Sequence, residues 1–168
     1  MFSPENKIPL FKVFMADTAA EEVTKILNSG YIGQGPKVDE FENNLQNYFD
    51  HDYIQTVNAG TSALHLALIL AGVKRGDEVI CQSSTFAATV NPIVYQAAIP
   101  IFIDSEKETW NMCPMLLEQA IKASLKNRKK PKAIVVVHLY GMPAKMDEIS
   151  TIANKYEITL IEDAAEAL

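Results

Sequence analysis

The 168-residue chain is 48% hydrophobic, which is enough for a folded domain with a buried core. Its formal net charge of −6 argues against nucleic acid or an anionic membrane as main partner, because both attract clustered positive charge. No signal peptide and no apolar stretch of roughly 18 residues is visible, so we expect a cytoplasmic protein without a membrane span.

Residues 1–52 are predicted to form an extended arm followed by two helices. Apolar residues at helical spacing predict helices at about 18–28 and 37–49, and Gly30 ends the first of them. The segment 31–36 between these helices is dense in turn residues.

From residue 53 onward, predicted strands alternate with predicted helices. This order indicates an α/β fold with a mostly parallel sheet and helices on both faces. We therefore treat 53–168 as a second domain. The predicted strands are 53–57, 78–81, 99–103, 133–137 and 159–162, and the predicted helices are 63–71, 85–97, 114–124 and 146–156.

The cysteines and histidines do not form a metal-binding pattern. Cys81 and Cys113 lie far apart with no CxxC motif, and we expect both to be free thiols in apolar surroundings. The three histidines have no HxxxH spacing, so the sequence predicts no metal site.

Polar residues follow four of the predicted strands, at 58–62, 82–86, 138–141 and 162–166. Ligands of open parallel sheets bind beyond the carboxyl ends of the strands, so these four segments are the candidate ligand region.

The turn that contains Gly60, Thr61 and Ser62 leads from a predicted strand into a helix. A helix start offers unpaired N–H groups and a positive dipole end, which favour a phosphate group. The alternative is that Thr61 or Ser62 only caps the helix. Neither a GxGxxG fingerprint nor a P-loop is present.

Four other side chains are candidates for ligand contact. Phe86 could stack on a planar ligand, or it could pack in the core. Asp163 follows a buried strand and needs a partner, for which a protonated ring nitrogen would serve; alternatively it caps a following helix. Glu166 could face the same side. His138 could touch a ligand or be a structural histidine.

In this order and spacing, several segments resemble the DegT/StrS-type sugar aminotransferases, which bind pyridoxal phosphate (PLP) in a type I aminotransferase fold. The resemblance covers nearly the whole chain, as part of the large domain of that fold without the small C-terminal domain. The segments that carry it are Gly30–Ile32, Gly35–Pro36, Val38–Glu42, Asn58–Leu68, Gly76–Ile80, Thr85–Asn91, Ile101–Asp104, His138–Gly141 and Glu162–Leu168.

The resemblance implies a set of PLP contacts. Thr61 and Ser62 would hold the phosphate at the helix start, and Phe86 would stack on one face of the pyridine ring. Asp163 would pair with the protonated ring nitrogen, and Glu166 would lie near the ring hydroxyl.

The resemblance also implies a substrate and a reaction. Tyr31 and the loop that begins at Gly33 would lie toward the sugar. The family moves an amino group from glutamate to a keto group on a nucleotide-linked sugar, and residues 138–149 and 162–168 look most like enzymes that act on UDP- or GDP-linked 4-keto-6-deoxy sugars. A homodimer is expected for the complete protein.

The Schiff-base lysine of this family is expected roughly 20–30 residues beyond Leu168. None of the lysines in this chain has its sequence context, so no catalytic residue is assigned here. We expect the 168 residues alone to have no transaminase activity and weak affinity for PLP at most.

Three other functions remain open at this point. One is a non-catalytic binding or scaffolding module with the same fold. Another is a PLP-dependent sugar dehydratase, in which histidine replaces the lysine. A Rossmann-like nucleotide-binding domain is disfavoured, because the glycine fingerprint is missing.

Overall fold

The computed structural model describes residues 12–167, and these fall into two units that divide between Thr56 and Val57. The first unit contains helices α1 (Ala19–Ser29) and α2 (Pro36–Phe49), close to the predicted ranges. Most of the predicted arm lies outside the described residues.

The prediction of a strand at 53–57 is wrong. No strand forms there. The side chain of Glu42 in α2 accepts hydrogen bonds from this segment, as a partner strand would do. Its Oε1 accepts hydrogen bonds from the Thr56 main-chain N–H at 2.8 Å and from the Thr56 hydroxyl at 2.7 Å. β-branched and aromatic residues favour a strand only where a second strand offers pairing.

The second unit is built on a sheet of four parallel strands in the order β2-β1-β3-β4, and the predicted α/β fold is confirmed. The strands are β1 (Glu78–Gln82), β2 (Ile99–Ile103), β3 (Ala133–Val137) and β4 (Thr159–Asp163). Every residue of β3 is buried, as its apolar sequence predicts.

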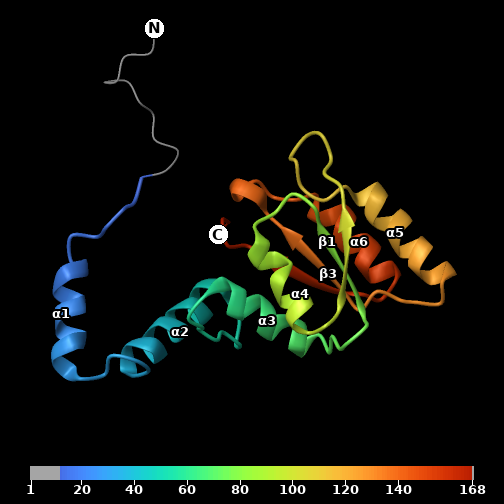
Figure 1. The fold of residues 1–168 in the computed structure, drawn as a ribbon. Helices are drawn as coiled ribbons and strands as arrows, with labels where there is room; N and C mark the ends of the chain where they lie inside the picture. Colours follow the sequence, from blue (N-terminus) through green and yellow to red (C-terminus); the bar gives the residue numbers. More distant parts are fainter. Residues whose placement is uncertain (1–11, 168) are drawn as a thin grey trace, which may run out of the picture. The chain divides into compact units, whose positions relative to one another are not determined.

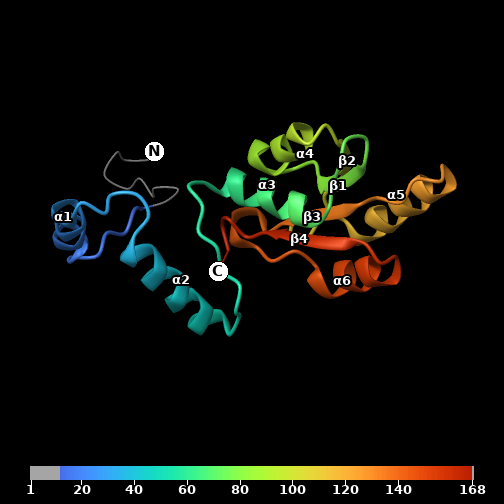
Figure 2. The same cartoon turned by 90° about the horizontal axis from the view of Figure 1, so that it is seen from below.

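Helices cover both faces of this sheet (Figures 1 and 2). They are α3 (Gly60–Leu70), α4 (Asn91–Tyr95), α5 (Pro114–Lys126) and α6 (Met146–Lys155). Along β1, Val79 and Cys81 pack with α3 and α4, whereas Ile80 between them packs with α5 and α6 on the other face. The alternation of side chains in the strands thus produces two separate cores.

The predicted helix at 85–97 is broken. Phe86 is extended, a short 3₁₀ turn follows at Ala87–Thr89, and α4 begins at Asn91. Pro92 has no main-chain N–H to continue an α-helix from the residues before it, and it occupies the first turn of α4 instead.

The strand order creates a crevice at the carboxyl edge of the sheet. The chain leaves β1 through α4 toward β2, but it leaves β3 through α6 toward β4, on the opposite side. The connections after the neighbouring strands β1 and β3 therefore diverge, which is where open α/β sheets bind ligands.

No helix within residues 12–167 has the length and apolar character needed to cross a lipid bilayer.

Candidate functional site

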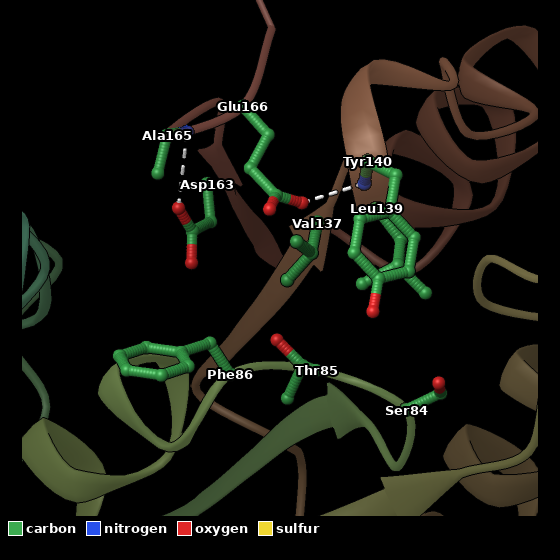
Figure 3. A pocket seen from close by; sticks show the side chains of 9 residues that line it. All are labelled: Ser84, Thr85, Phe86, Val137, Leu139, Tyr140, Asp163, Ala165 and Glu166. Carbon is green, nitrogen blue, oxygen red and sulfur yellow. Dashed lines mark hydrogen bonds between the residues drawn. The ribbon is translucent and has the colours of Figure 1, made fainter. Parts of the chain in front are cut away.

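An open cavity of about 380 Å³ lies at the carboxyl edge of the sheet. Its walls come from the segments that follow β1, β3 and β4, three of the four strand ends singled out in the sequence (Figure 3). The lining residues are Ser84, Thr85, Phe86, Val137, Leu139, Tyr140, Asp163, Ala165 and Glu166.

The fully buried side chain of Gln82 links β1 to β3 near the carboxyl ends of these strands. Its Oε1 accepts a hydrogen bond from the Val137 main-chain N–H at 3.1 Å, and its Nε2 donates to the Ser84 carbonyl at 2.9 Å. The Gln82 amide therefore continues the hydrogen bonding between β1 and β3 beyond the last main-chain pair, next to two residues that line the cavity, Ser84 and Val137.

Phe86 is not a core residue, because 81% of it is exposed. Figure 3 shows its ring across the opening from the carboxylate of Asp163. A planar group that entered the cavity could contact the ring with one face while one of its edges met the carboxylate.

Asp163 is the last residue of β4 and is only 9% exposed. Its Oδ2 accepts a hydrogen bond from the Thr89 hydroxyl at 2.7 Å, and its Oδ1 accepts one from the Ala165 N–H at 3.3 Å. Within residues 12–167, no lysine, arginine or histidine forms an ion pair with this carboxylate, so its site suits a positively charged group in the cavity.

Glu166 contributes to the cavity by holding the turn that presents Tyr140. Its Oε2 accepts a hydrogen bond from the Tyr140 N–H at 2.5 Å. Tyr140 has left-handed dihedral angles (φ 54°, ψ 29°), which are rare for a residue other than glycine and are often found at functional sites.

The buried Asn111 also fixes this turn. Its Oδ1 accepts from the Leu139 N–H at 2.9 Å, and its Nδ2 donates to the Met142 carbonyl at 2.7 Å. The sequence did not single out Asn111 or Thr89 as site residues, and it indicated Tyr140 only as part of the segment 138–141. For Tyr140 the signal was its place after an apolar strand; Asn111 and Thr89 are identified only by their hydrogen bonds.

His138 is a structural histidine. Its Nδ1 accepts from the Ala144 N–H at 3.1 Å, so in the neutral ring Nε2 carries the proton and donates to Glu162 at 3.1 Å. His138 is not among the residues that line the cavity.

Helix α3 begins at Gly60, so Thr61 and Ser62 lie inside its first turn and neither caps it. The Ser62 hydroxyl donates to Asn58 Oδ1 at 2.8 Å. The N–H groups of Gly60 and Thr61 precede the first intrahelical bond and are available to an anion. These residues do not line the cavity, although α3 packs against the 3₁₀ turn that follows Phe86.

Tyr31 and Gly33 lie in the first unit, and both are exposed. Their role toward a sugar stays a prediction.

Neither a metal centre nor a reactive amine is present at the cavity. Within residues 12–167, no cluster of three or more His, Cys, Asp or Glu could hold a metal ion, and no lysine is among the cavity-lining residues. Burial raises the pKa of the Cys81 thiol to about 12, so this cysteine is not a nucleophile near neutral pH.

Comparison with known proteins places this architecture in one family. EpsN of Bacillus subtilis (strain 168), whose name describes a pyridoxal phosphate-dependent aminotransferase, is 45% identical over 97% of the chain and 42% of its own length. GDP-perosamine synthase of Escherichia coli O157:H7 is 41% identical over 95% of the chain and 43% of its own length.

A solved structure is also similar to this chain in fold and sequence. The crystal structure of NtdA from Bacillus subtilis with bound cofactor PMP (pyridoxamine phosphate) matches with a TM-score of 0.81 and 33% identity, over 89% of this chain and 33% of NtdA. The chain spans about two fifths of the length of the two curated relatives. The model of the DegT/DnrJ/EryC1/StrS aminotransferase family matches residues 14–168, and the chain belongs to this family.

Proposed function

We propose that the chain is the N-terminal part of a PLP-dependent aminotransferase that transfers an amino group from glutamate to a nucleotide-linked keto-sugar. The observation that carries the proposal is an exposed aromatic ring that lies across one cavity from a buried carboxylate, which has no cationic partner within residues 12–167. The name of GDP-perosamine synthase supports a nucleotide-linked sugar as the substrate, and the PMP bound to NtdA supports PLP as the cofactor.

The residues at the cavity have the chemistry that PLP requires. When bound, PLP supplies a protonated pyridine ring that withdraws electrons from the carbon bearing the amine. Asp163 would hold the proton at the ring nitrogen, because no lysine, arginine or histidine of the described chain neutralises its carboxylate. Phe86 would cover one face of the ring and exclude water from it.

The phosphate would bind at the start of α3. The N–H groups of Gly60 and Thr61 and the hydroxyl of Thr61 would donate to it, and the positive end of the helix dipole would add to the attraction.

Glu166 would take part in two ways. One of its oxygens holds the Tyr140 N–H, and the other remains available to accept a hydrogen bond from the ring hydroxyl.

The 168 residues alone are proposed to be inactive. Amino transfer needs a base that moves a proton at the substrate carbon, and no lysine lies among the residues that line the cavity. The complete protein would supply this lysine and would act as a homodimer.

A binding experiment tests the cofactor site in the chain itself. PLP is titrated into the 168-residue chain, and binding is followed by the change in PLP absorbance. We expect weak binding that Asp163→Asn and Phe86→Ala each reduce about tenfold, about 1.4 kcal/mol, because one removes a charge and the other a stacking surface.

Two control variants carry the same changes away from the cavity. Asp147→Asn alters an exposed carboxylate in α6, and Trp110→Ala removes an exposed aromatic ring outside the cavity. Both should leave the affinity for PLP unchanged. If wild type and all four variants bind PLP equally, the cofactor site is not at this cavity. Amino-transfer assays on the complete protein then separate an aminotransferase from a dehydratase or a scaffold.

A further inference from the structure

We infer that Thr89 is a positioning residue, which fixes the carboxylate of Asp163 through an ordered chain of hydroxyl hydrogen bonds that begins at Thr85. The inference about Asp163 stands on the geometry of the free chain. Its extension to PLP rests on the proposed function.

The three side chains form a continuous chain of hydrogen bonds from the cavity into the protein interior and back. Thr85 Oγ1 and Thr89 Oγ1 are 2.8 Å apart, and Thr89 Oγ1 is 2.7 Å from Asp163 Oδ2. Thr89 is only 1% exposed, so water cannot replace either partner. Thr85 and Asp163 both line the cavity, whereas Thr89 does not.

The number of protons fixes the direction of each bond. A carboxylate only accepts hydrogen bonds, so the single hydroxyl proton of Thr89 is donated to Asp163. Thr89 then has no proton for Thr85, and the bond between the two hydroxyls must be donated by Thr85. The order of donation is therefore Thr85 to Thr89 to Asp163.

This order determines what the cavity offers to a ligand. The only proton of the Thr85 hydroxyl is used inside the protein, so toward the cavity this oxygen can only accept. The Thr85 hydroxyl is turned toward the Asp163 side of the opening (Figure 3). The wall formed by Thr85 and Asp163 is therefore made of acceptors, and it selects a ligand edge that carries N–H or O–H groups, such as a protonated ring nitrogen.

The fixed orientation of Asp163 is tested first in the ligand-free chain. The χ1 populations of Asp163 are measured by NMR scalar couplings in the wild type, Thr89→Val and Thr89→Ser. Valine has the shape of threonine without the hydroxyl, and serine keeps the hydroxyl. We expect one dominant rotamer in wild type and Thr89→Ser, and averaged couplings in Thr89→Val. A single unchanged rotamer in Thr89→Val overturns the inference.

The effect on the ligand is tested by PLP titration of the same proteins. We expect Thr89→Val to weaken PLP binding about tenfold and Thr89→Ser to restore most of the affinity, since a hydrogen bond to a charged group is lost in one and kept in the other. In an Asp163→Asn background, Thr89→Val should cause little further loss, because Thr89 acts through Asp163.

The control is Thr151→Val, which removes an exposed threonine hydroxyl that bonds only to the Asp147 carbonyl within α6. It should change neither the Asp163 rotamer nor PLP affinity. If Thr89→Val weakens binding equally in the wild-type and Asp163→Asn backgrounds, the role of Thr89 is not positioning and the inference fails. If the wild-type chain does not bind PLP, the proposed cofactor site fails while the rotamer measurement still decides the role of Thr89.

Discussion

Two residues at the cavity lower the stability of the folded chain. Asp163 is a carboxylate in a largely buried position, and Tyr140 is a non-glycine residue in the left-handed region. Hydrogen bonds donated by Thr89 and Ala165 offset the first cost. Those that Asn111 and Glu166 accept from the turn around Tyr140 offset the second. The surrounding fold therefore stabilises Asp163 and Tyr140 in unfavourable states at the cavity.

Gly141, next to Tyr140, is predicted to be intolerant of a side chain. Its φ is +78°, and an added Cβ would lie 2.9 Å from the carbonyl oxygen of Glu166. We expect Gly141→Ala to lower the free energy of unfolding by more than about 2 kcal/mol, because left-handed strain and a steric clash add together. Urea unfolding followed by circular dichroism measures the loss.

Gly76→Ala is the matched control for the clash. Gly76 has φ +83°, but an added Cβ would meet no atom within 4 Å. This variant should therefore cost only the conformational strain, about 1 kcal/mol. Equal losses in the two variants would mean that residues 164–167 move aside and do not hold the turn.

At the scale of elements, the sequence predicted what depends on local pattern. The apolar segment 133–137 became a fully buried strand, and the helical spacing over 114–124 became α5. The pattern could not show that 53–57 lacks a partner strand. It also took no account of Pro92, which lies in the first turn of a new helix after the 3₁₀ turn, where a continuous helix was predicted.

The residues of the candidate site likewise fall into those that the sequence could predict and those that it could not. Phe86, Asp163 and Glu166 could be picked out because polar or aromatic residues that follow parallel strands meet at one edge of the sheet. Thr89 and Asn111 could not, because their roles depend on partners far along the chain. Thr89 bonds a residue 74 positions away, and Asn111 bonds residues 28 and 31 positions away.

Acid should weaken the loop that carries Asn111, through Glu106. The Thr109 hydroxyl, the N–H groups of Glu108 and Thr109, and the nearby Lys145 lower the pKa of Glu106 from its ordinary value of 4.5 to about 2. A lowered pKa in the folded state means that the stabilisation is complete above about pH 4.5 and is lost as the pH falls toward about 2.

The prediction is tested by urea unfolding between pH 6 and pH 3. In the wild type, the midpoint should fall as the pH drops below about 4.5, whereas Glu106→Gln should start from a lower midpoint and fall less over this range. Glu157→Gln, which changes a highly exposed side chain, is the control and should follow the wild type. Parallel curves for wild type and Glu106→Gln would show that Glu106 is not a source of acid sensitivity.

At the scale of the whole molecule, the two units differ in what they bury. Helices α1 and α2 contain no buried residue, and they are 11 and 14 residues long. The second unit has a core on each face of its sheet, with β1 and β3 buried between them. Helices of this length are marginal in water without packing, so most of the stability of the chain resides in the second unit.

Hydrogen exchange should therefore separate the two units. We expect the amides of α1 and α2 to exchange close to the rate of an unfolded chain, because local opening of these helices exposes little apolar surface. The amides of β3 should exchange only on global unfolding, since β3 pairs with β1 on one side and β4 on the other. Deuterium uptake read by mass spectrometry on peptides from each segment measures both, with β2, a strand paired on one side by β1, as an internal reference of intermediate protection. Protection of α2 equal to that of β3 would contradict this distribution of stability. Such protection requires buried apolar residues, and α2 has none.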